Sequence, residues 1–425
     1  MKQNITGISK VIFLLQIKIK VLFHYTVELF QGKINIVKFV RLLRRLLYLV
    51  KKLSHNKFVR INGETKIDLY IPGFGSKAFW TSCNKFKEFK KSLPCSTVLI
   101  SVTNACKNRC SHCYQRFDKG KDISIDKLTN VVKQLQDMGI AFFNIEGGDP
   151  FIKFDRLKAV CEQIDDRSSI WINSSGDGIT EERLQILKEY PVKAIMFPLT
   201  YTDKDTYDRF FKRKGAFDTM IKAVDLCHNI KIPVAINTCP PAANLHNGEF
   251  DRVMEKAKDL GAIMVQVIKL KEAGAALNSD IVDYTKEDLI LLNNKVYKYN
   301  NSRRHKDFPS ISAQIFEESK EMFGCTAGGT ERFYINAKGD VQPCEFLNIS
   351  FGNIADQPFE KIYSSMKSVF ADARDCWLCE KYQMEIFNLF KKNGILPLSA
   401  DQSKKIYQHW DRGQKTELYT KIIRM

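Results

Sequence analysis

Three cysteines close together in the first third of the chain have the types and spacing that point most directly to chemistry. Cys106, Cys110 and Cys113 stand as C-x3-C-x2-C, directly after an apolar run that begins at Thr97. Thiolates at this spacing can surround one metal centre. Four nearby cysteines would indicate a closed zinc site, whereas three ligands on an iron–sulfur cluster leave one iron free for a substrate or cofactor. A zinc site completed by His112 or by a distant side chain is the alternative.

A glycine pair follows the next predicted strand. Residues 142–146 run directly into Gly147, Gly148, Asp149 and Pro150, and glycines at a strand end let a ligand approach the backbone closely. On its own this tetrapeptide would be an ordinary turn. The order of these features, a cysteine loop followed by a helix, a strand and G-G-D-P, resembles the radical S-adenosylmethionine (SAM) superfamily. The signatures of that superfamily are such a loop and a G-G-E-P stretch. Asp149 stands where that pattern has glutamate.

The resemblance implies a cofactor and roles for these residues. It implies a [4Fe-4S] cluster on Cys106, Cys110 and Cys113 that cleaves SAM to a 5′-deoxyadenosyl radical, with a flavodoxin- or ferredoxin-type reductant. His112 takes the position of an aromatic ring beside the adenine; a loop histidine facing solvent is the alternative. The remaining SAM contacts that it implies are Gly147, Gly148, Asp149, Pro150, Asn173, Ser174 and Ser175.

A second cysteine group lies near the C-terminus. Cys325 and Cys344 bracket a predicted hairpin with Gly339 at its turn, and Cys376 and Cys379 follow as C-x2-C. Four such cysteines would close a tetrahedral centre, for which zinc is the default on spacing alone. The C-x13-G-x4-C spacing, however, resembles the SPASM and Twitch extensions of radical SAM enzymes. It implies a one-cluster, Twitch-type domain whose auxiliary [4Fe-4S] cluster has four protein ligands and transfers electrons.

The elements that must position these cysteines are strands alternating with helices. Six apparent strands lie between residues 97 and 268, separated by amphipathic helical stretches. This alternation predicts an α/β fold with a parallel sheet, a partial (β/α)6 TIM-type barrel whose active site lies at the C-terminal strand ends. Both motifs fall at such ends, as do Cys239 and the loop Lys269–Ala275. Cys239 is more typical of a core residue than of a substrate-linking thiol.

The positive charge of the chain is concentrated at its N-terminus. Of the formal net charge of +18, residues 1–60 contribute +12. Residues 34–53 place apolar side chains on one half of a helical wheel and six basic residues on the other, the pattern of a helix on an anionic membrane surface. A helix packed on its own protein is the alternative. Residues 8–30 are apolar but interrupted by charges, so they make a poor transmembrane span.

Five parts follow from these patterns. A basic amphipathic helical segment at 1–58, expected to anchor the protein to a membrane surface, precedes a connector at 59–94 and the radical SAM barrel at 95–315. A Twitch/SPASM-like hairpin and helix domain at 316–385 and a helical tail at 386–425 complete the chain. The segment before the barrel predicts helices, not a three-stranded peptide-recognition unit. Twelve cysteines without a cleavable secretory signal favour the cytoplasm, with attachment to the inner face of the membrane.

The resemblance implies an enzyme that abstracts hydrogen from a peptide, a protein or a small molecule. The basic N-terminus motivates a membrane lipid or isoprenoid as an alternative substrate. A non-catalytic zinc-binding scaffold docked to membranes is an alternative from another class. Nucleic acid is disfavoured as a partner, because the charge lies on an amphipathic helix and is not interleaved with aromatic residues over a groove.

Overall fold

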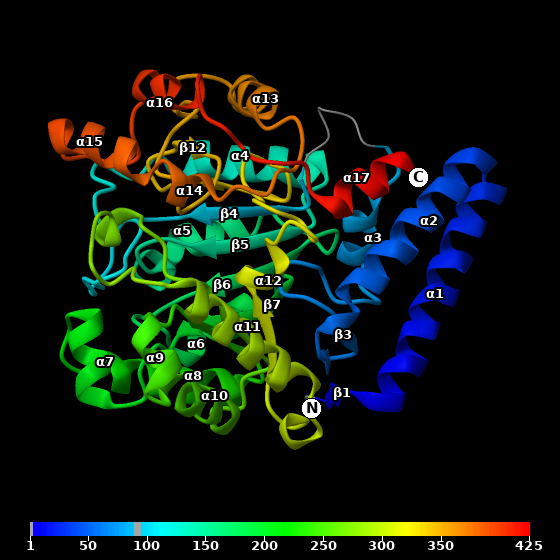
Figure 1. The fold of residues 1–425 in the computed structure, drawn as a ribbon, viewed down its shortest axis with the longest axis horizontal. Helices are drawn as coiled ribbons and strands as arrows, with labels where there is room; N and C mark the ends of the chain where they lie inside the picture. The colour runs from blue at the N-terminus through cyan, green and yellow to red at the C-terminus, as the bar shows by residue number, and fades with distance from the viewer. Residues whose placement is uncertain (1–2, 89–94) are drawn as a thin grey trace.

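The computed structural model describes residues 3–88 and 95–425 (Figure 1). Its strands are β1 (Gln3–Ile5), β2 (Phe58–Ile61), β3 (Glu64–Lys66), β4 (Thr97–Ser101), β5 (Phe142–Glu146), β6 (Ser169–Asn173), β7 (Val192–Pro198), β8 (Val234–Thr238), β9 (Met264–Val267), β10 (Ser310–Ala313), β11 (Arg332–Ile335) and β12 (Val341–Gln342). Its α-helices are α1 (Gly7–Phe30), α2 (Ile36–Lys52), α3 (Lys77–Asn84), α4 (Ile125–Met138), α5 (Phe154–Cys161), α6 (Glu181–Leu187), α7 (Lys204–Phe211), α8 (Ala216–Ile230), α9 (Ala242–His246), α10 (Glu249–Asp259), α11 (Lys286–Asn301), α12 (Gln314–Glu317), α13 (Phe359–Val369), α14 (Leu378–Lys381), α15 (Gln383–Asn393), α16 (Ala400–Tyr407) and α17 (Glu417–Arg424).

A nine-stranded sheet forms the centre of the molecule, in the order β10-β9-β8-β7-β6-β5-β4-β11-β12. Strands β4 to β10 are parallel to their neighbours, as the predicted partial barrel requires. The six predicted strands each lie within one residue of the observed bounds. Strand β10, parallel to β9, extends the series and was not predicted.

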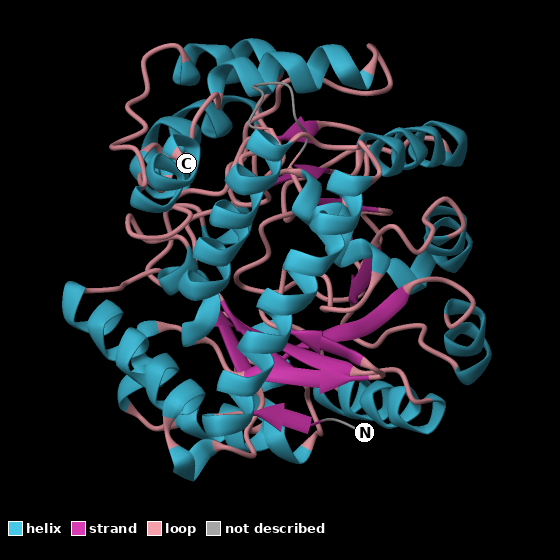
Figure 2. Ribbon diagram, turned by 90° about the vertical axis from the view of Figure 1, so that its right-hand side faces the viewer, coloured by secondary structure: helices cyan, strands magenta, loops and turns pink. Residues whose placement is uncertain are grey.

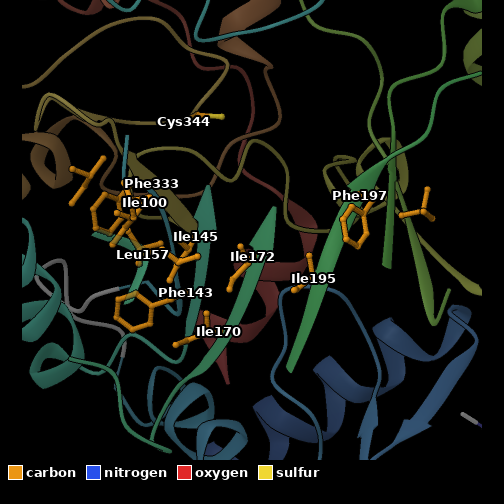
Figure 3. Close-up of a cluster of buried hydrophobic side chains, with 14 of the residues drawn as sticks. Ile100, Phe143, Ile145, Leu157, Ile170, Ile172, Ile195, Phe197, Phe333 and Cys344 are labelled. Atoms are coloured by element: carbon orange, nitrogen blue, oxygen red, sulfur yellow. The ribbon is translucent and has the colours of Figure 1, made fainter. Parts of the chain in front are cut away.

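The strands are buried on both faces, which is why they read as nearly continuous apolar runs. Every residue of β4 and of β5 is buried. Ile145, Ile172 and Ile195 come from consecutive strands and face the same core layer (Figure 3). Leu157 of α5 joins them in the same cluster, so the helices between strands seal the outer side of the sheet.

The predicted C-terminal hairpin is confirmed, and it is part of the barrel sheet. β11 and β12 pair antiparallel, with Tyr334 opposite Gln342. β11 also pairs in parallel with β4, with Phe333 opposite Val98. The segment that carries the second cysteine group is therefore joined to the strand that precedes the first.

The predicted N-terminal helices are present, but a small three-stranded antiparallel sheet, β1-β2-β3, also precedes the barrel, so the expectation that no three-stranded unit lies there is wrong. The N-G turn between β2 and β3 is as predicted, since Asn62 and Gly63 both have positive φ, at 49° and 83°. β1 has only three residues and pairs with a strand far along the chain, with Gln3 opposite Arg60. A segment this short carries no readable period.

The connector closes the N-terminal end of the barrel. Val59 and Leu69 pack against Phe142 and Trp171, which point into the barrel from β5 and β6. The buried Lys66 ammonium lies 5.1 Å from the centroids of both of these rings and donates a 2.8 Å hydrogen bond to the Leu69 carbonyl.

Helix α2 packs on the protein, as the alternative interpretation held. Its apolar side, including Leu42, Leu46 and Leu49, is buried together with residues of α1 and α17. Arg45, one of its predicted solvent-facing cations, is buried and donates to the Phe86 carbonyl at 2.9 Å. Among the described helices none has the length and apolar character needed to cross a membrane.

Candidate functional site

A cavity of about 350 Å³ opens at the C-terminal ends of the barrel strands. The sequence-predicted residues that line it are Cys106, Cys110, Cys113, His112, Gly147, Gly148, Asn173, Ser174 and Ser175. Cys239 and the loop after β9, through Leu270 and Lys271, also reach it. The structure thus brings together residues from five strand ends, as expected for a barrel of this kind.

Backbone hydrogen bonds hold the cysteine loop over this cavity. The Arg109 and Ser111 amides donate to the carbonyls of Phe211 and Phe210 at the end of α7, at 3.1 and 3.0 Å. The carbonyl of Cys113 accepts a 2.9 Å bond from the Ala275 amide, in the loop after β9. The position of the thiols is therefore set by two neighbouring barrel segments.

The two glycines are required by close approach of the cysteine loop. The amides of Gly148 and Asp149 each donate a 2.7 Å bond, to the carbonyls of Thr103 and Ala105. A Cβ at Gly148 would lie 2.2 Å from the Ala105 oxygen, and one at Gly147 would lie 2.6 Å from the Thr103 oxygen. Only glycine lets these two backbone segments meet.

Asp149 connects two strand ends and does not line the cavity. Its fully buried carboxylate accepts hydrogen bonds from the Ser175 amide at 2.8 Å and from the Ser174 hydroxyl at 3.0 Å. It also caps the following turn through the Phe151 amide at 3.2 Å. The side chain thereby holds the G-G-D-P turn against the Asn173–Ser175 turn, while Pro150 is buried beside it.

His112 is half-buried and not solvent-facing. Its ring stacks on Phe210, with 4.7 Å between centroids and an interplanar angle of 15°. Burial lowers the pKa of His112 to about 4, so the imidazole is neutral at physiological pH. Its Nδ1 is buried and has no hydrogen-bond partner among the described residues.

Other polar atoms around the cavity are also unpaired. Buried side-chain oxygens of Asn104, Asn144 and Asn173 have no hydrogen-bond partner within the described part of the chain. Buried polar groups are normally paired, so these atoms indicate a polar ligand. Three thiols beside unpaired amide and imidazole groups fit a cluster with bound SAM. In residues 3–88 and 95–425, no three His, Cys, Asp or Glu side chains surround a single-ion site.

The structure adds site residues that the sequence patterns did not identify. Glu146, at the end of β5, accepts hydrogen bonds from the Tyr114 hydroxyl at 2.5 Å and from the Asn173 amide at 3.0 Å. Burial raises the pKa of Glu146 to about 8. Tyr70 of the connector forms the cavity floor and accepts a 2.7 Å bond from Gln266. Glu146 could have been nominated by its strand-end position, whereas Tyr70 offers no such signal.

The C-terminal cysteines converge near the hairpin. The Cys325 amide donates a 2.7 Å bond to the Arg374 carbonyl, which brings Cys325 beside the C-x2-C turn. Burial raises the pKa of the Cys379 thiol, and the nearby Cys325 raises it further. Burial likewise raises the pKa of Cys344, with Cys379 among the neighbours that add to the shift. Cys376 is half-buried at the start of the same turn.

Lysines from the loop after β9 connect the two cysteine groups. The buried Lys271 ammonium lies 2.7 Å from the Glu380 carboxylate and 3.2 Å from the centroid of the Trp377 ring. Lys269 pairs with the same carboxylate at 2.9 Å. Glu380 follows Cys379 directly, so the cavity wall is anchored to the second cysteine group.

Comparison with known proteins agrees with this geometry. Residues 100–264 match the model of the radical SAM superfamily, and residues 325–385 match that of the SPASM iron-sulfur cluster-binding domain. The AdoMet-dependent heme synthase of Methanosarcina barkeri is 24% identical over 310 residues, covering 67% of this chain and 88% of that protein. The PqqA peptide cyclase of Rhizobium meliloti is 22% identical over 300 residues, covering 68% and 78%.

Solved structures share the fold. The crystal structure of Streptococcus suis SuiB bound to S-adenosylmethionine superposes with a TM-score of 0.55 at 16% identity, covering 73% of this chain and 78% of that chain. This shared fold confirms the predicted barrel, and the two family models confirm the predicted enzyme class and cofactors. The chain belongs to the radical SAM superfamily, as an enzyme with a SAM-binding [4Fe-4S] cluster and a SPASM-type auxiliary iron–sulfur domain.

Proposed function

We propose that this enzyme modifies a peptide or protein by abstracting a hydrogen atom from one of its residues. The observation that carries the proposal is the size of the cavity. At about 350 Å³ it lies at the small end of ligand pockets, and SAM must share it with the substrate. A peptide can insert one side chain while the rest of it stays outside. The relative named PqqA peptide cyclase supports this class, and the heme synthases make a small molecule the competing one.

We assign the cofactor contacts as follows. Cys106, Cys110 and Cys113 hold the first cluster, which with SAM supplies the 5′-deoxyadenosyl radical. The Gly147 and Gly148 backbone, together with the side chains of His112, Asn173, Ser174 and Ser175, contacts SAM, while Asp149 and Pro150 keep this wall in place. Cys325, Cys344, Cys376 and Cys379 hold the auxiliary cluster.

Other side chains act on the substrate space. Tyr70 forms part of the cavity wall and stands between this cavity and a smaller one of about 60 Å³ that it also lines. Glu146 is held by hydrogen bonds from Tyr114 and Asn173, and its carboxyl is protonated at neutral pH. It can exchange one hydrogen bond with the substrate group that lies beside it. This arrangement orients the reacting residue without adding a charge.

Isotope transfer tests the substrate class. Cells grown in deuterated medium are extracted into a protein and peptide fraction and a lipid fraction, and each is added to the reconstituted enzyme with SAM and dithionite. Deuterium in 5′-deoxyadenosine from the protein fraction is the expected result. Deuterium delivered only by the lipid fraction would overturn the proposal in favour of a lipid or isoprenoid substrate. The variant with alanine at Cys106, Cys110 and Cys113 is the matched control.

The electron donor and the domain bounds form part of the same proposal. We place the catalytic barrel at 95–315, the auxiliary domain at 316–385 and the helical tail at 386–425.

A flavodoxin- or ferredoxin-type protein supplies the electron to the first cluster. Replacing dithionite by such a protein with its reductase should sustain deoxyadenosine formation; failure of both carrier types would exclude them. Location at the inner face of the membrane rests on the N-terminal helices.

A further inference from the structure

Helix α1 is apolar on two opposite sides but covered on only one. Phe13, Ile17, Val21 and Tyr25 face the protein and are buried. The opposite side is a stripe of exposed apolar side chains that recur every three or four residues, singly or as adjacent pairs, along the whole helix. The stripe consists of Ile8, Val11, Ile12, Leu15, Ile19, Leu22, Phe23, Val27 and Phe30.

The stripe is exposed to an extent that single surface residues do not explain. Phe23 is 70% exposed, Ile8 81% and Phe30 85%. An apolar side of a helix is normally covered, and an exposed apolar patch of this length marks an interaction site. Ile36 and Val37, at the start of α2, continue it and are 59% and 53% exposed. The stripe and these two residues are called the α1 face below.

The charged residues of α1 and α2 that flank the α1 face are basic, and the Glu88 carboxylate pairs with Lys38 of α2. Lys18 on α1 and Arg41 and Arg44 on α2 are exposed. Lys20 is exposed as well, with its ammonium 5.6 Å from the centroid of the Phe74 ring. Residues 3–52 are all described and contain a single acid, Glu28. Glu28 is turned away and paired with Lys87 at 2.9 Å. A second copy of this chain would bring these cations together, so charge disfavours self-association.

We propose that the α1 face binds the surface of an anionic phospholipid bilayer, with α1 lying in the plane of the interface. The apolar stripe enters the headgroup and acyl boundary, and the flanking lysines and arginines contact anionic headgroups. This assigns membrane binding to a different element from the one that the sequence pattern favoured, because the apolar side of α2 is already buried. The proposal rests on the location part of the proposed function and on none of its chemistry.

The placement of α1 sets the direction of the active site. Figure 1 shows α1 at the right-hand edge of the molecule, while the loop that follows β4 leaves the sheet toward the left. Figure 2 looks onto the helical side that would meet the bilayer. Binding through this face therefore leaves the loop after β4, which lines the cavity, on the side of the molecule away from the lipid.

Vesicle sedimentation of the reconstituted full chain tests the proposal. Vesicles of phosphatidylcholine mixed with phosphatidylglycerol are compared with vesicles of phosphatidylcholine alone. We expect at least about tenfold tighter binding to the anionic vesicles, lost at high salt, because each basic residue near such a surface adds about a factor of five. The variant Ile12→Gln, Ile19→Gln, Phe23→Gln should lose about a hundredfold or more in affinity.

A matched triple variant controls for apolar exposure in general. Ile290→Gln, Tyr297→Gln and Met384→Gln alter side chains that are 62%, 61% and 47% exposed elsewhere, and should bind as the unaltered chain does. Wild-type protein that stays in the supernatant, or an α1 variant that binds fully, would overturn the proposal. So would a dimer that dissociates in the α1 variant, since it would identify a second copy as the occupant. Deoxyadenosine formation without vesicles should be unchanged in both variants, which separates this result from a failure of the chemistry.

Discussion

Replacing Gly148 by alanine should lower both the stability of the protein and the rate of SAM cleavage, and the structure sets the size of each loss. The new Cβ would lie 2.2 Å from the Ala105 oxygen, more than 1 Å inside an ordinary contact. Gly148 has no left-handed φ, so the penalty is purely steric. The two 2.7 Å bonds from Gly148 and Asp149 to the cysteine loop must lengthen or break. We expect a loss of about 2–4 kcal/mol in unfolding free energy from the clash and the bonds together.

The effect on catalysis should exceed the effect on folding. Moving the cysteine loop by about 1 Å relative to the SAM wall misplaces the reacting atoms, which costs on the order of a hundredfold in rate. The rate of 5′-deoxyadenosine formation at saturating SAM is measured beside iron content and urea unfolding. Gly139→Ala is the control: it forces alanine to φ 93° at a helix end with no neighbour within 4 Å, costing about 1–2 kcal/mol of stability but no activity. A Gly148→Ala enzyme within twofold of the wild-type rate would refute the reasoning.

Three further changes test the remaining assignments. Alanine at Cys106, Cys110 and Cys113 should lower the iron content from about eight to about four per chain and abolish the formation of deoxyadenosine. Alanine at the four C-terminal cysteines should lower the iron content by the same amount. An unchanged iron content in either variant would contradict the ligand set that it removes. Lys66→Met should cost about 2–4 kcal/mol of unfolding free energy, because the buried carbonyl of Leu69 and the partly buried carbonyl of Ile71 lose their donor. An unchanged unfolding free energy would contradict this structural role. The pKa of Glu146 rises on folding from 4.5 to about 8, so its contribution to stability is full below pH 4.5 and is lost as pH rises toward 8, at about 1.4 kcal/mol per pH unit. Urea unfolding at pH 6, 7 and 8 should show this slope in the wild type and a flatter profile in Glu146→Gln; equal slopes would place its pKa elsewhere.

The barrel strands were predictable because most of their residues are apolar and buried. TVLIS of β4 and FFNIE of β5 have no exposed residue, so each stands out as a short apolar run that ends in a motif. Strands β1 and β10 lack an apolar run, since β10 is also fully buried but its sequence, SISA, alternates serine with apolar residues. They have three and four residues, and β1 pairs with a strand that lies beyond two long helices. Their pairing is decided by packing of distant segments, which local patterns do not contain.

The same distinction applies to the site. The cysteine and glycine motifs were readable because the residues of each motif are close together in the sequence. Tyr70, by contrast, reaches the cavity only because the connector enters the barrel from its N-terminal end. The amphipathic pattern of α2 predicted an apolar side correctly but not what covers it. Protein packing and membrane binding demand the same periodicity. Only the position of α1 and α17 over α2 decides between them.

The two cysteine groups share one framework, which determines how the auxiliary domain has to be tested. β11 lengthens the sheet at β4, and the loop after β9 bonds to the cysteine loop through Ala275 and to Glu380 through Lys271. Deleting residues 316–385 would expose the edge of β4 and release a cavity wall. Loss of activity in such a truncation would therefore say nothing of electron transfer. Substitution of Cys379, which leaves these contacts in place, is the informative change: if the auxiliary cluster takes the electron from the substrate, SAM cleavage should persist while modified product disappears.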